Sequence, residues 1–353
     1  MNRSLIIFFG FLLIMASTTA QAESPTPNLI TIFPYHLGSL NPKDYRYTPP
    51  APPRNVWQKI DKILQQHNLR LTVSKNFSQE TFNNSVKIIC LNVPHWIPGA
   101  MGRISECPQQ KSILITFEPP VVLPSNFSKH VLNSFGRVLT WDDSLVDNKK
   151  FFKFNYYDYR PLVEDIPPYS QKNFLTQISR NSRSSHPLEL YSERLRAIRY
   201  FEKRPDIEFE FYGTKWADQG YRNYKGSPPN KLAVLKNYKF SLCYENTKNV
   251  KGYITEKILD CFAAGCVPIY WGAPNITDYI PANCFISRVD FSSLDELVDF
   301  LQKIDEKTYN QYLQNIKNFL NSRQAQAFSQ EAFIQAVLLV CGVSDPPLLS
   351  TGQ

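Results

Sequence analysis

Residues 239–271 read KFSLCYENTKNVKGYITEKILDCFAAGCVPIYW, and this stretch contains the unit from which the rest of the fold can be inferred. Residues 239–244 form a short, largely apolar run, which is typical of a strand buried in a parallel sheet. Residues 255–264 place apolar side chains at helical spacing, and a second apolar run follows at 267–270. A strand, a helix and a strand in this order predict a parallel βαβ unit.

The same alternation continues on both sides of this unit. Further short apolar runs, which predict strands, lie at 29–33, 86–91, 113–117, 138–141, 174–178, 207–212 and 285–289. Helical patterns lie at 57–66, 189–203, 231–236, 293–304 and 308–320. Two such series, separated by a seam near residues 156–173, predict an α/β protein with two facing Rossmann-like domains, each built on a parallel sheet.

The expected domain bounds follow from this division. We expect an N-terminal Rossmann-like domain over residues 23–165 and a C-terminal one over residues 166–325. A C-terminal helix and tail are expected over residues 326–353. Residues 1–22 are treated separately, because they have the layout of an export signal.

In that signal, Arg3 precedes an apolar run from Leu5 to Ala16, and the small residues Ala20 and Ala22 follow it. The apolar run is shorter than the roughly 20 residues that a membrane helix needs. We therefore expect a signal peptide over residues 1–22 that is cleaved on export to a periplasm or secretory pathway. The mature chain would be soluble or peripherally associated with a membrane, and the alternative is an uncleaved signal anchor.

The composition is that of a globular protein with a basic balance. The 353 residues carry a formal net charge of +8, and 43% are hydrophobic against 20% charged, which argues against wholesale disorder. A basic balance is compatible with nucleic acid, an anionic membrane or a phosphate-bearing ligand. The total charge does not choose among these partners.

The cysteines argue against a structural metal. All seven lie outside the expected signal peptide, and an odd number leaves at least one thiol unpaired. Their spacing matches no zinc motif, so no metal site is expected. Cys90 and Cys107 are close enough in sequence to be plausible partners, although sequence does not settle the connectivity. Four sequons would matter only in a glycosylating secretory pathway, and they are at Asn76, Asn83, Asn126 and Asn275.

A first candidate site lies at the carboxyl ends of the C-terminal strands, where open parallel sheets bind ligands. Residues 244–247, Tyr-Glu-Asn-Thr, end one strand, and the next helix carries Glu256 and Lys257 in its first turn with Thr255 as a fair N-cap. A helix N-terminus and Lys257 together favour an anion such as phosphate. Taken alone, the pattern favours an ordinary capped helix with a solvated Glu256–Lys257 pair.

The helix at 189–203 supplies a further cation. Arg194 borders the apolar stripe of this helix, whereas Arg196, Arg199 and Lys203 lie on another, solvated face. Arg194 is therefore the residue placed to reach into a cleft. A long side chain lying along the helix flank explains its position almost as well.

A second candidate site is Glu118, which ends the apolar strand at 113–117 and is followed by two prolines. An apolar neighbour such as Phe117 would raise the pKa of this carboxyl, which suits a general base. The alternative is a strand-terminating glutamate in a turn. The pair Asp142-Asp143 is interpreted as a turn at a strand end rather than as a metal site.

These residues resemble a known family. Residues 240–290 are similar to the donor-binding signature of the α-1,3-fucosyltransferases, glycosyltransferase family 10, in the segments YENT at 244–247, GYITEKILD at 252–260 and VPIYWG at 267–272. Order and spacing continue to fit back through Arg194 to the TFEPP segment at 116–120. The resemblance covers roughly residues 112–291.

The resemblance implies a GT-B fold with an N-terminal acceptor domain and a C-terminal GDP-fucose domain. It implies inverting transfer of fucose from GDP-fucose to a hydroxyl of a GlcNAc-containing glycan, in α-1,3 linkage. Cations in place of a metal would hold the donor, so no cofactor is expected and a divalent metal would be at most stimulatory. Nucleic acid is not an expected partner.

The same resemblance gives the site residues their expected roles. Glu118 matches the general base that removes the proton from the acceptor hydroxyl. Arg194 and Lys257 match the cations that hold the pyrophosphate, and Glu256 matches the carboxylate that contacts fucose. The further donor-pocket positions that match are Asn246 and Tyr253.

An exported two-lobed solute- or carbohydrate-binding protein without catalysis is the alternative from another class. It would also have two Rossmann-like lobes and a signal peptide. The run Thr255-Glu256-Lys257 argues against it, because a binding protein needs no clamp for a leaving group. Acceptor specificity, including α-1,3 against α-1,4 linkage, would depend on N-terminal loops such as 35–38 and 95–98.

Overall fold

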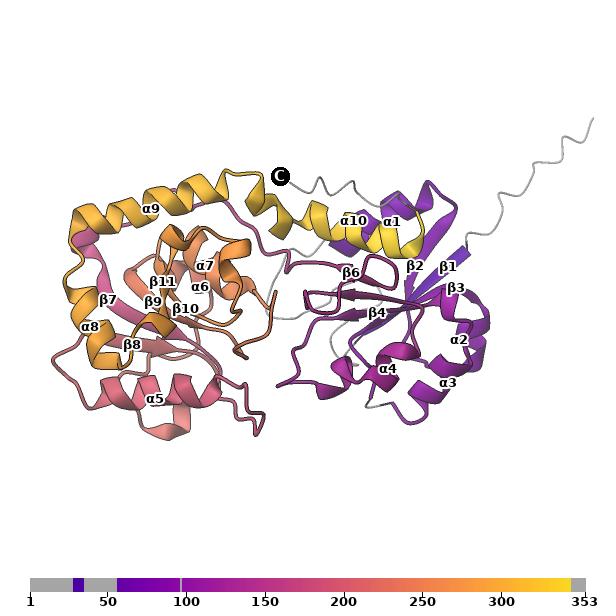
Figure 1. Cartoon of the computed structure of the whole chain (residues 1–353), viewed down its shortest axis with the longest axis horizontal. Coiled ribbons are helices and arrows are strands. Elements are labelled where there is room, and N and C mark those ends of the chain that lie inside the picture. The colour runs from indigo at the N-terminus through magenta and orange to yellow at the C-terminus, as the bar shows by residue number, and fades with distance from the viewer. Residues whose placement is uncertain (1–27, 35–55, 96, 344–353) are drawn as a thin grey trace, which may run out of the picture.

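The computed structural model describes residues 28–34, 56–95 and 97–343, and these form two lobes that lie side by side (Figure 1). Each lobe is built on one sheet with helices on both faces. All pairings between the named strands of these residues are parallel. The predicted α/β fold with two parallel sheets is therefore confirmed.

The sheet of the N-terminal lobe has its strands in the order β2-β1-β3-β4-β5-β6. The strands are β1 (Asn28–Phe33), β2 (Leu69–Val73), β3 (Ser85–Leu91), β4 (Ser112–Thr116), β5 (Arg137–Thr140) and β6 (Phe151–Lys153). The helices between them are α1 (Val56–Gln65), α2 (Gln79–Asn83), α3 (Ala100–Glu106) and α4 (Lys129–Asn133). The sequence pattern missed β2 and β6 because both are short edge strands whose side chains are only partly buried.

The sheet of the C-terminal lobe has the order β11-β10-β9-β7-β8. Its strands are β7 (Asn173–Ile178), β8 (Phe209–Tyr212), β9 (Tyr238–Tyr244), β10 (Val267–Trp271) and β11 (Ile286–Ser287). Its helices are α5 (Tyr191–Glu202), α6 (Lys231–Leu235), α7 (Glu256–Ala263), α8 (Leu294–Gln302) and α9 (Glu306–Leu320). The predicted βαβ unit is β9-α7-β10. The predicted strand at 285–289 is shorter than expected, because the chain turns into a 3₁₀ helix at Arg288–Asp290.

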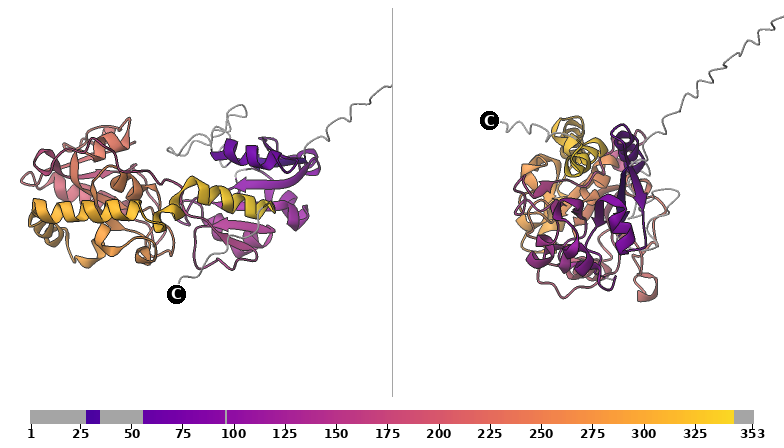
Figure 2. Two further views of the ribbon diagram at one scale, coloured as in Figure 1. Left: turned by 90° about the horizontal axis from the view of Figure 1, so that it is seen from above. Right: turned by 90° about the vertical axis from the view of Figure 1, so that its right-hand side faces the viewer.

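After the C-terminal lobe, the chain returns to the N-terminal one. Helix α10 (Gln330–Cys341) lies beside α1 and contacts β5 and β6 (Figures 1 and 2). Phe333 and Val337 are buried in the same apolar cluster as Trp57 and Phe117. The helix expected within 326–353 is thus part of the core of the N-terminal lobe.

Several expectations fall on residues that the structure does not describe. The signal peptide at 1–22, the loop at 35–38 and Trp96 lie outside the described ranges. Within those ranges, no helix is both long and apolar enough to cross a membrane. The bounds 23–165 and 166–325 stay predictions.

The cysteines are all buried and all unpaired. Cys90 and Cys107 lie in one apolar cluster, but as free thiols, so the disulfide considered between them is not formed. Burial raises the pKa of Cys90 well above its usual range, which keeps the thiol protonated. Among the sequons, Asn126 has no exposed surface, so its amide is not accessible for glycosylation.

Candidate active site

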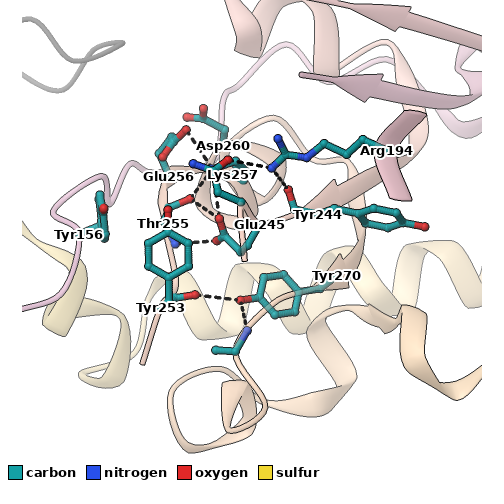
Figure 3. A network of polar contacts seen from close by, with 12 residues as sticks. Tyr156, Arg194, Tyr244, Glu245, Tyr253, Thr255, Glu256, Lys257, Asp260 and Tyr270 are labelled. Atoms are coloured by element: carbon teal, nitrogen blue, oxygen red, sulfur yellow. Dashed lines mark hydrogen bonds and ion pairs between the residues drawn. The ribbon is translucent and has the colours of Figure 1, made fainter. Parts of the chain in front are cut away.

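Glu245 ties the end of β9 to the start of α7. It follows β9 directly, has no exposed surface, and accepts hydrogen bonds from Thr255 N and Oγ1, both at 2.8 Å (Figure 3). Its Oε2 also lies 3.1 Å from Lys257 Nζ. Thr255 occupies the N-cap position, but its side chain makes no cap hydrogen bond because its hydroxyl is given to Glu245. The prediction that Thr255 is the N-cap residue is confirmed, although its hydroxyl donates to Glu245 instead of accepting from the first turn of α7.

Glu256 and Lys257 form part of a largely buried charge network. The exposed fractions of their side chains are 17% and 21%, which corrects the solvated pair that the pattern alone favoured. Lys257 Nζ lies 3.6 Å from Glu256 Oε1, and Lys231 Nζ lies 3.4 Å from that oxygen and 3.3 Å from Asp260 Oδ2. The network joins the first turns of α6 and α7.

Both members of this pair are charged at neutral pH. Burial by itself would raise the pKa of Glu256, but Lys257 and Lys231 lower it to about 2. Burial would lower the pKa of Lys257, whereas Glu245 and Glu256 raise it above its ordinary value. The site therefore holds an ionised carboxylate beside a protonated amine.

Arg194, on α5, extends to the carboxyl end of β9. It is buried, and its Nη2 donates to the carbonyl oxygen of Tyr244 at 2.6 Å and to Asn246 Oδ1 at 3.0 Å. The Arg196 side chain, by contrast, is 71% exposed and pairs with Glu193. The structure thus places Arg194, but not Arg196, against the carboxyl end of β9.

A small cavity of about 30 Å³ at this edge of the sheet is lined by the cations Arg194, Lys231 and Lys257 and by the carboxylate of Asp260. Its remaining wall comes mainly from the ends of β7 and β9, where open parallel sheets place their ligands. The first turn of α7 also lies here through Lys257, and the first N–H groups of a helix have no partner within the helix. Such an arrangement favours an anionic ligand, in particular one that carries phosphate groups.

Tyr253 lies between the two lobes. It is 2% exposed, and its ring centroid is 4.6 Å from that of Trp141 and 6.1 Å from that of Tyr156. Its carbonyl oxygen accepts a hydrogen bond from the Tyr270 hydroxyl at 3.3 Å (Figure 3). The predicted donor-pocket residue is therefore buried against aromatic side chains of the N-terminal lobe and the segment that leaves it.

Glu118 lies just beyond β4, on the N-terminal side of the boundary between the lobes. The pKa of its carboxyl is raised above the ordinary value, mainly by burial. The charge of Lys257 lowers this pKa in part, and the charge of Glu256 raises it further. Its carboxylate has no hydrogen-bond partner among the residues that the structure describes. The structure therefore brings Glu118 within electrostatic reach of the charges at the start of α7.

Direct contacts hold the two lobes together next to this site. Asp143 pairs with Lys153 at 2.6 Å in its own lobe and accepts hydrogen bonds from Asn275 Nδ2 at 2.9 Å and the Tyr279 hydroxyl at 2.5 Å in the other. Gly252 has φ +79°, and a Cβ there would come within 2.3 Å of the Trp141 carbonyl oxygen. Asp143 is thus an interlobe contact, and no metal cluster occurs among the described His, Cys, Asp and Glu residues.

Four charged residues of this region had no individual role assigned from sequence, namely Glu245, Lys231, Asp158 and Asp260, although Glu245 lies within the candidate segment 244–247. Glu245 could have been given one, because it directly follows a buried strand at the carboxyl edge of the sheet. Lys231 carried no signal, because its role depends on how α6 packs against α7. Asp158 is 5% exposed, and burial, with Glu256 and Asp260 adding to it, raises its pKa well above the ordinary value.

The comparisons with known proteins agree with this geometry. The family model described as "Glycosyltransferase family 10 (fucosyltransferase) C-term" matches residues 171–344. This chain carries a glycosyltransferase family 10 domain. The family 10 domain contains Arg194, Asn246, Tyr253, Glu256 and Lys257, whereas Glu118 lies before it.

Two curated relatives show how far the likeness extends. Alpha-(1,3)-fucosyltransferase FucT of Helicobacter pylori is 37% identical over 100 residues, which cover 28% of this chain and 20% of that protein. The 4-galactosyl-N-acetylglucosaminide 3-alpha-L-fucosyltransferase 9 of Mus musculus is 31% identical over 217 residues, which cover 60% and 55%. The matches thus span about a fifth of the bacterial relative and about half of the mouse one.

Solved structures extend the likeness of fold beyond the family 10 domain. An alpha1,3-fucosyltransferase with GDP superposes with a TM-score of 0.54 at 17% identity, over 92% of this chain and 93% of that chain. T4 phage β-glucosyltransferase in complex with its UDP-glucose substrate gives 0.52 at 14% identity, over 88% and 99%. At these identities the likeness shows the fold alone, and that fold is the predicted GT-B type.

Proposed function

We propose that this protein is an inverting fucosyltransferase, which moves fucose from GDP-fucose to a hydroxyl of a GlcNAc-containing glycan in α-1,3 linkage. The observation that carries the proposal is the position of Glu118, within electrostatic reach of Lys257 and Glu256 across the lobe boundary. A base on one lobe and a cationic cavity on the other are what transfer between two bound substrates requires. The family of the C-terminal lobe supports the same reaction.

The C-terminal lobe would bind the donor. Lys257, Arg194 and the N-terminus of α7 would hold the pyrophosphate and stabilise the negative charge that builds on GDP as it leaves. Glu256 is ionised because of its two lysine neighbours, so it can stabilise the positive charge that develops at the anomeric carbon of fucose. Asn246 would fix the direction of the Arg194 guanidinium through their hydrogen bond.

The N-terminal lobe would bind the acceptor, with Glu118 as the general base. The raised pKa of Glu118 brings the carboxyl closer to the range in which a base works well at neutral pH. Removal of the acceptor proton lets the hydroxyl oxygen attack the anomeric carbon from the face opposite GDP. The bond to the GDP oxygen breaks on the other face, so a single displacement inverts the configuration.

We further propose the domain bounds given above, with residues 23–165 for the acceptor and 166–325 for the donor. Cleavage of residues 1–22 and export of the remaining chain are part of the same proposal. The exported binding protein without catalysis remains the alternative, and it differs from the enzyme in an observable way. A binding protein would retain GDP-fucose unchanged, whereas the enzyme would consume it.

The direct test is a transfer assay with residues 23–353, GDP-fucose and a panel of glycans with and without GlcNAc. We expect stoichiometric release of GDP together with fucosylation of the GlcNAc-containing members, and mass spectrometry and NMR should map the new linkage to O3 of GlcNAc. Tight binding of GDP-fucose with no transfer to any glycan would favour the binding-protein alternative. Fucosylation at a different oxygen would keep the enzyme but contradict the proposed linkage.

The absence of a metal requirement is a separate prediction. Because cationic side chains surround the cavity, we expect the transfer rate after treatment with EDTA to stay within about twofold of the untreated rate. Added Mn²⁺ or Mg²⁺ should change it little. A loss of activity with EDTA that either ion restores would contradict the prediction.

A further inference from the structure

The backbone that carries Glu118 is held by two buried asparagine side chains. Asn92 follows β3 and is 1% exposed, and Asn126, in the 3₁₀ turn Pro124–Phe127, is fully buried. Asn92 Oδ1 accepts hydrogen bonds from Phe117 N at 2.7 Å and Glu118 N at 2.9 Å. Asn126 Nδ2 donates to Glu118 O at 3.0 Å. Asn92 lies outside residues 112–291, over which the resemblance to the family runs, and Asn126 lies within that range but outside the quoted segments.

These contacts provide hydrogen-bond partners that the strand ladder does not supply. Strand β4 ends at Thr116, so the N–H groups of the next two residues have no partner in the strand ladder. Buried backbone groups without a partner cost free energy, and Asn92 Oδ1 accepts from both of these N–H groups, while Asn126 Nδ2 donates to the Glu118 carbonyl oxygen. On the other side of the same peptide, the carbonyl oxygen of Phe117 accepts from Trp141 Nε1 at 3.1 Å and from the Tyr156 hydroxyl.

The orientation of both side-chain amides is fixed by their neighbours. Asn126 Oδ1 accepts from Val93 N at 2.8 Å, so the other terminal atom of Asn126 is the donor Nδ2. That Nδ2 also donates to Asn92 Oδ1 at 2.7 Å. The Oδ1 of Asn92 therefore accepts three hydrogen bonds. Its Nδ2 is buried and has no partner among the described residues.

We propose that Asn92 and Asn126 are positioning residues that place the Glu118 carboxylate for its work as a base. The proposal rests on the proposed function, because it assigns the reason for holding this peptide to the reaction of Glu118. Asn92 has φ +61°, a left-handed conformation that asparagine adopts more readily than most residues. This choice of residue fits a position that needs both that backbone and an accepting amide oxygen.

The two asparagines differ in whether the Nδ2 atom donates a hydrogen bond, and this difference provides a test. In Asn92→Asp, an oxygen replaces the Nδ2 atom that donates to nothing, so all three accepted hydrogen bonds survive. In Asn126→Asp, an oxygen replaces the Nδ2 atom that donates to both Asn92 Oδ1 and Glu118 O, so two attractions become repulsions. One substitution at two neighbouring asparagines is therefore expected to give opposite results.

Asn92→Asp also adds a negative charge beside Glu118. The new aspartate would be ionised, because the three hydrogen bonds that it accepts favour its charged form. The groups that already face Glu118 stay the same: Lys257 and Glu256 on α7, Tyr253 just before it, and Tyr191 on α5. We expect the acid limb of the kcat/KM profile to move up by about one pH unit, with the plateau kcat within about threefold of the wild type. Asn68→Asp is the control, because Asn68 is exposed and has a similar φ of +54°. It should leave the profile unchanged.

Variants that remove the hydrogen bonds from Asn92 or Asn126 to the backbone at Glu118 should have a lower kcat. Asn126→Asp, and Asn92→Gly, which removes the acceptor but tolerates the left-handed backbone, are expected to lose about 100-fold in kcat. Their Kd for GDP-fucose should stay within about twofold, because the donor cavity is on the other lobe. Thermal melting of each variant would show that folded protein is being compared. Equal kcat in Asn92→Asp and Asn126→Asp, or an unmoved acid limb in Asn92→Asp, would overturn the proposal.

A second readout does not depend on transfer. The Glu118 carboxyl can be followed by ¹³C NMR titration, with its signal assigned by its loss in Glu118→Gln. Asn92→Asp should raise the pKa of this carboxyl, and Asn68→Asp should not. A wild-type chain that fails to transfer fucose would overturn the proposed function, while an unshifted Glu118 signal in Asn92→Asp would overturn the positioning role whether or not transfer occurs.

Discussion

Replacing Glu118 with glutamine is expected to lower kcat for fucose transfer by about 10²–10⁴-fold, while the Kd for GDP-fucose stays within about twofold. Glutamine keeps the shape of the side chain but cannot take up the acceptor proton. The cavity proposed to bind the donor is lined by residues of the C-terminal lobe, so the affinity for GDP-fucose should be little affected. Steady-state kinetics with a glycan acceptor and calorimetric titration with GDP-fucose would measure the two quantities.

The pH dependence provides an independent check on the same residue. A general base works only when deprotonated, and burial raises the pKa of Glu118 above its ordinary value. The wild-type rate should therefore fall as the pH drops through this raised pKa, and the fall should be absent from the residual activity of Glu118→Gln. Glu80→Gln, at an exposed position on α2, is the matched control. Full activity in Glu118→Gln would remove Glu118 as the base.

Replacing Lys257 or Arg194 with alanine is expected to weaken GDP binding by about 10–100-fold, because each change would remove one of the proposed charge-assisted contacts to the pyrophosphate. Arg196→Ala and Arg199→Ala, on the exposed side of the same helix α5, should change the Kd by less than twofold. Titration calorimetry with GDP measures all four. Similar losses in all four variants would mean that general positive charge, rather than the position of Arg194, governs binding.

Lys257→Ala needs one further control. The substitution leaves the fully buried Glu245 carboxylate without its cation, and breaking a buried pair in this way destabilises proteins by about 3–5 kcal/mol. The double variant Lys257→Ala/Glu245→Gln removes the orphaned charge and should recover much of that stability. Its GDP affinity should remain low. Recovered binding in the double variant would show that the single variant lost folded protein rather than a phosphate contact.

The βαβ core of the fold was predictable because buried strands and amphipathic helices leave strong local patterns. Strand β9 is buried along almost its whole length, and the apolar spacing of α7 is helical, so both could be found from residues 239–271 alone. The edge strands β2 and β6 are half exposed and leave no such pattern. Helix α10 was expected as a C-terminal helix, but its place on the N-terminal lobe depends on contacts far apart in sequence.

Parts of the candidate site were predictable for a similar reason. Glu118 ends an apolar strand, and Arg194 borders an apolar helical stripe, so each has a local signal. The charged state of Glu256 has none, because it depends on Lys231 from another helix. Asn92 and Asn126 support Glu118 from loops 26 and 8 residues away in sequence, and only the folded chain brings them together. Thr255 was correctly predicted as the N-cap residue of α7. That its hydroxyl donates to Glu245 depends on the folded structure and could not be predicted.

The position of helix α10 has a consequence for the order in which the two lobes can be completed during synthesis. Phe333 contacts Phe117, the residue next to Glu118, with ring centroids 6.0 Å apart, and it also contacts Trp57 and Tyr157. During translation, residues 330–341 emerge from the ribosome only after the whole C-terminal lobe. Until then the apolar cluster around Phe117, next to Glu118, lacks the side chains that α10 contributes to it. The first lobe to be synthesised is therefore the last to be completed, because residues 330–341 supply part of its hydrophobic core.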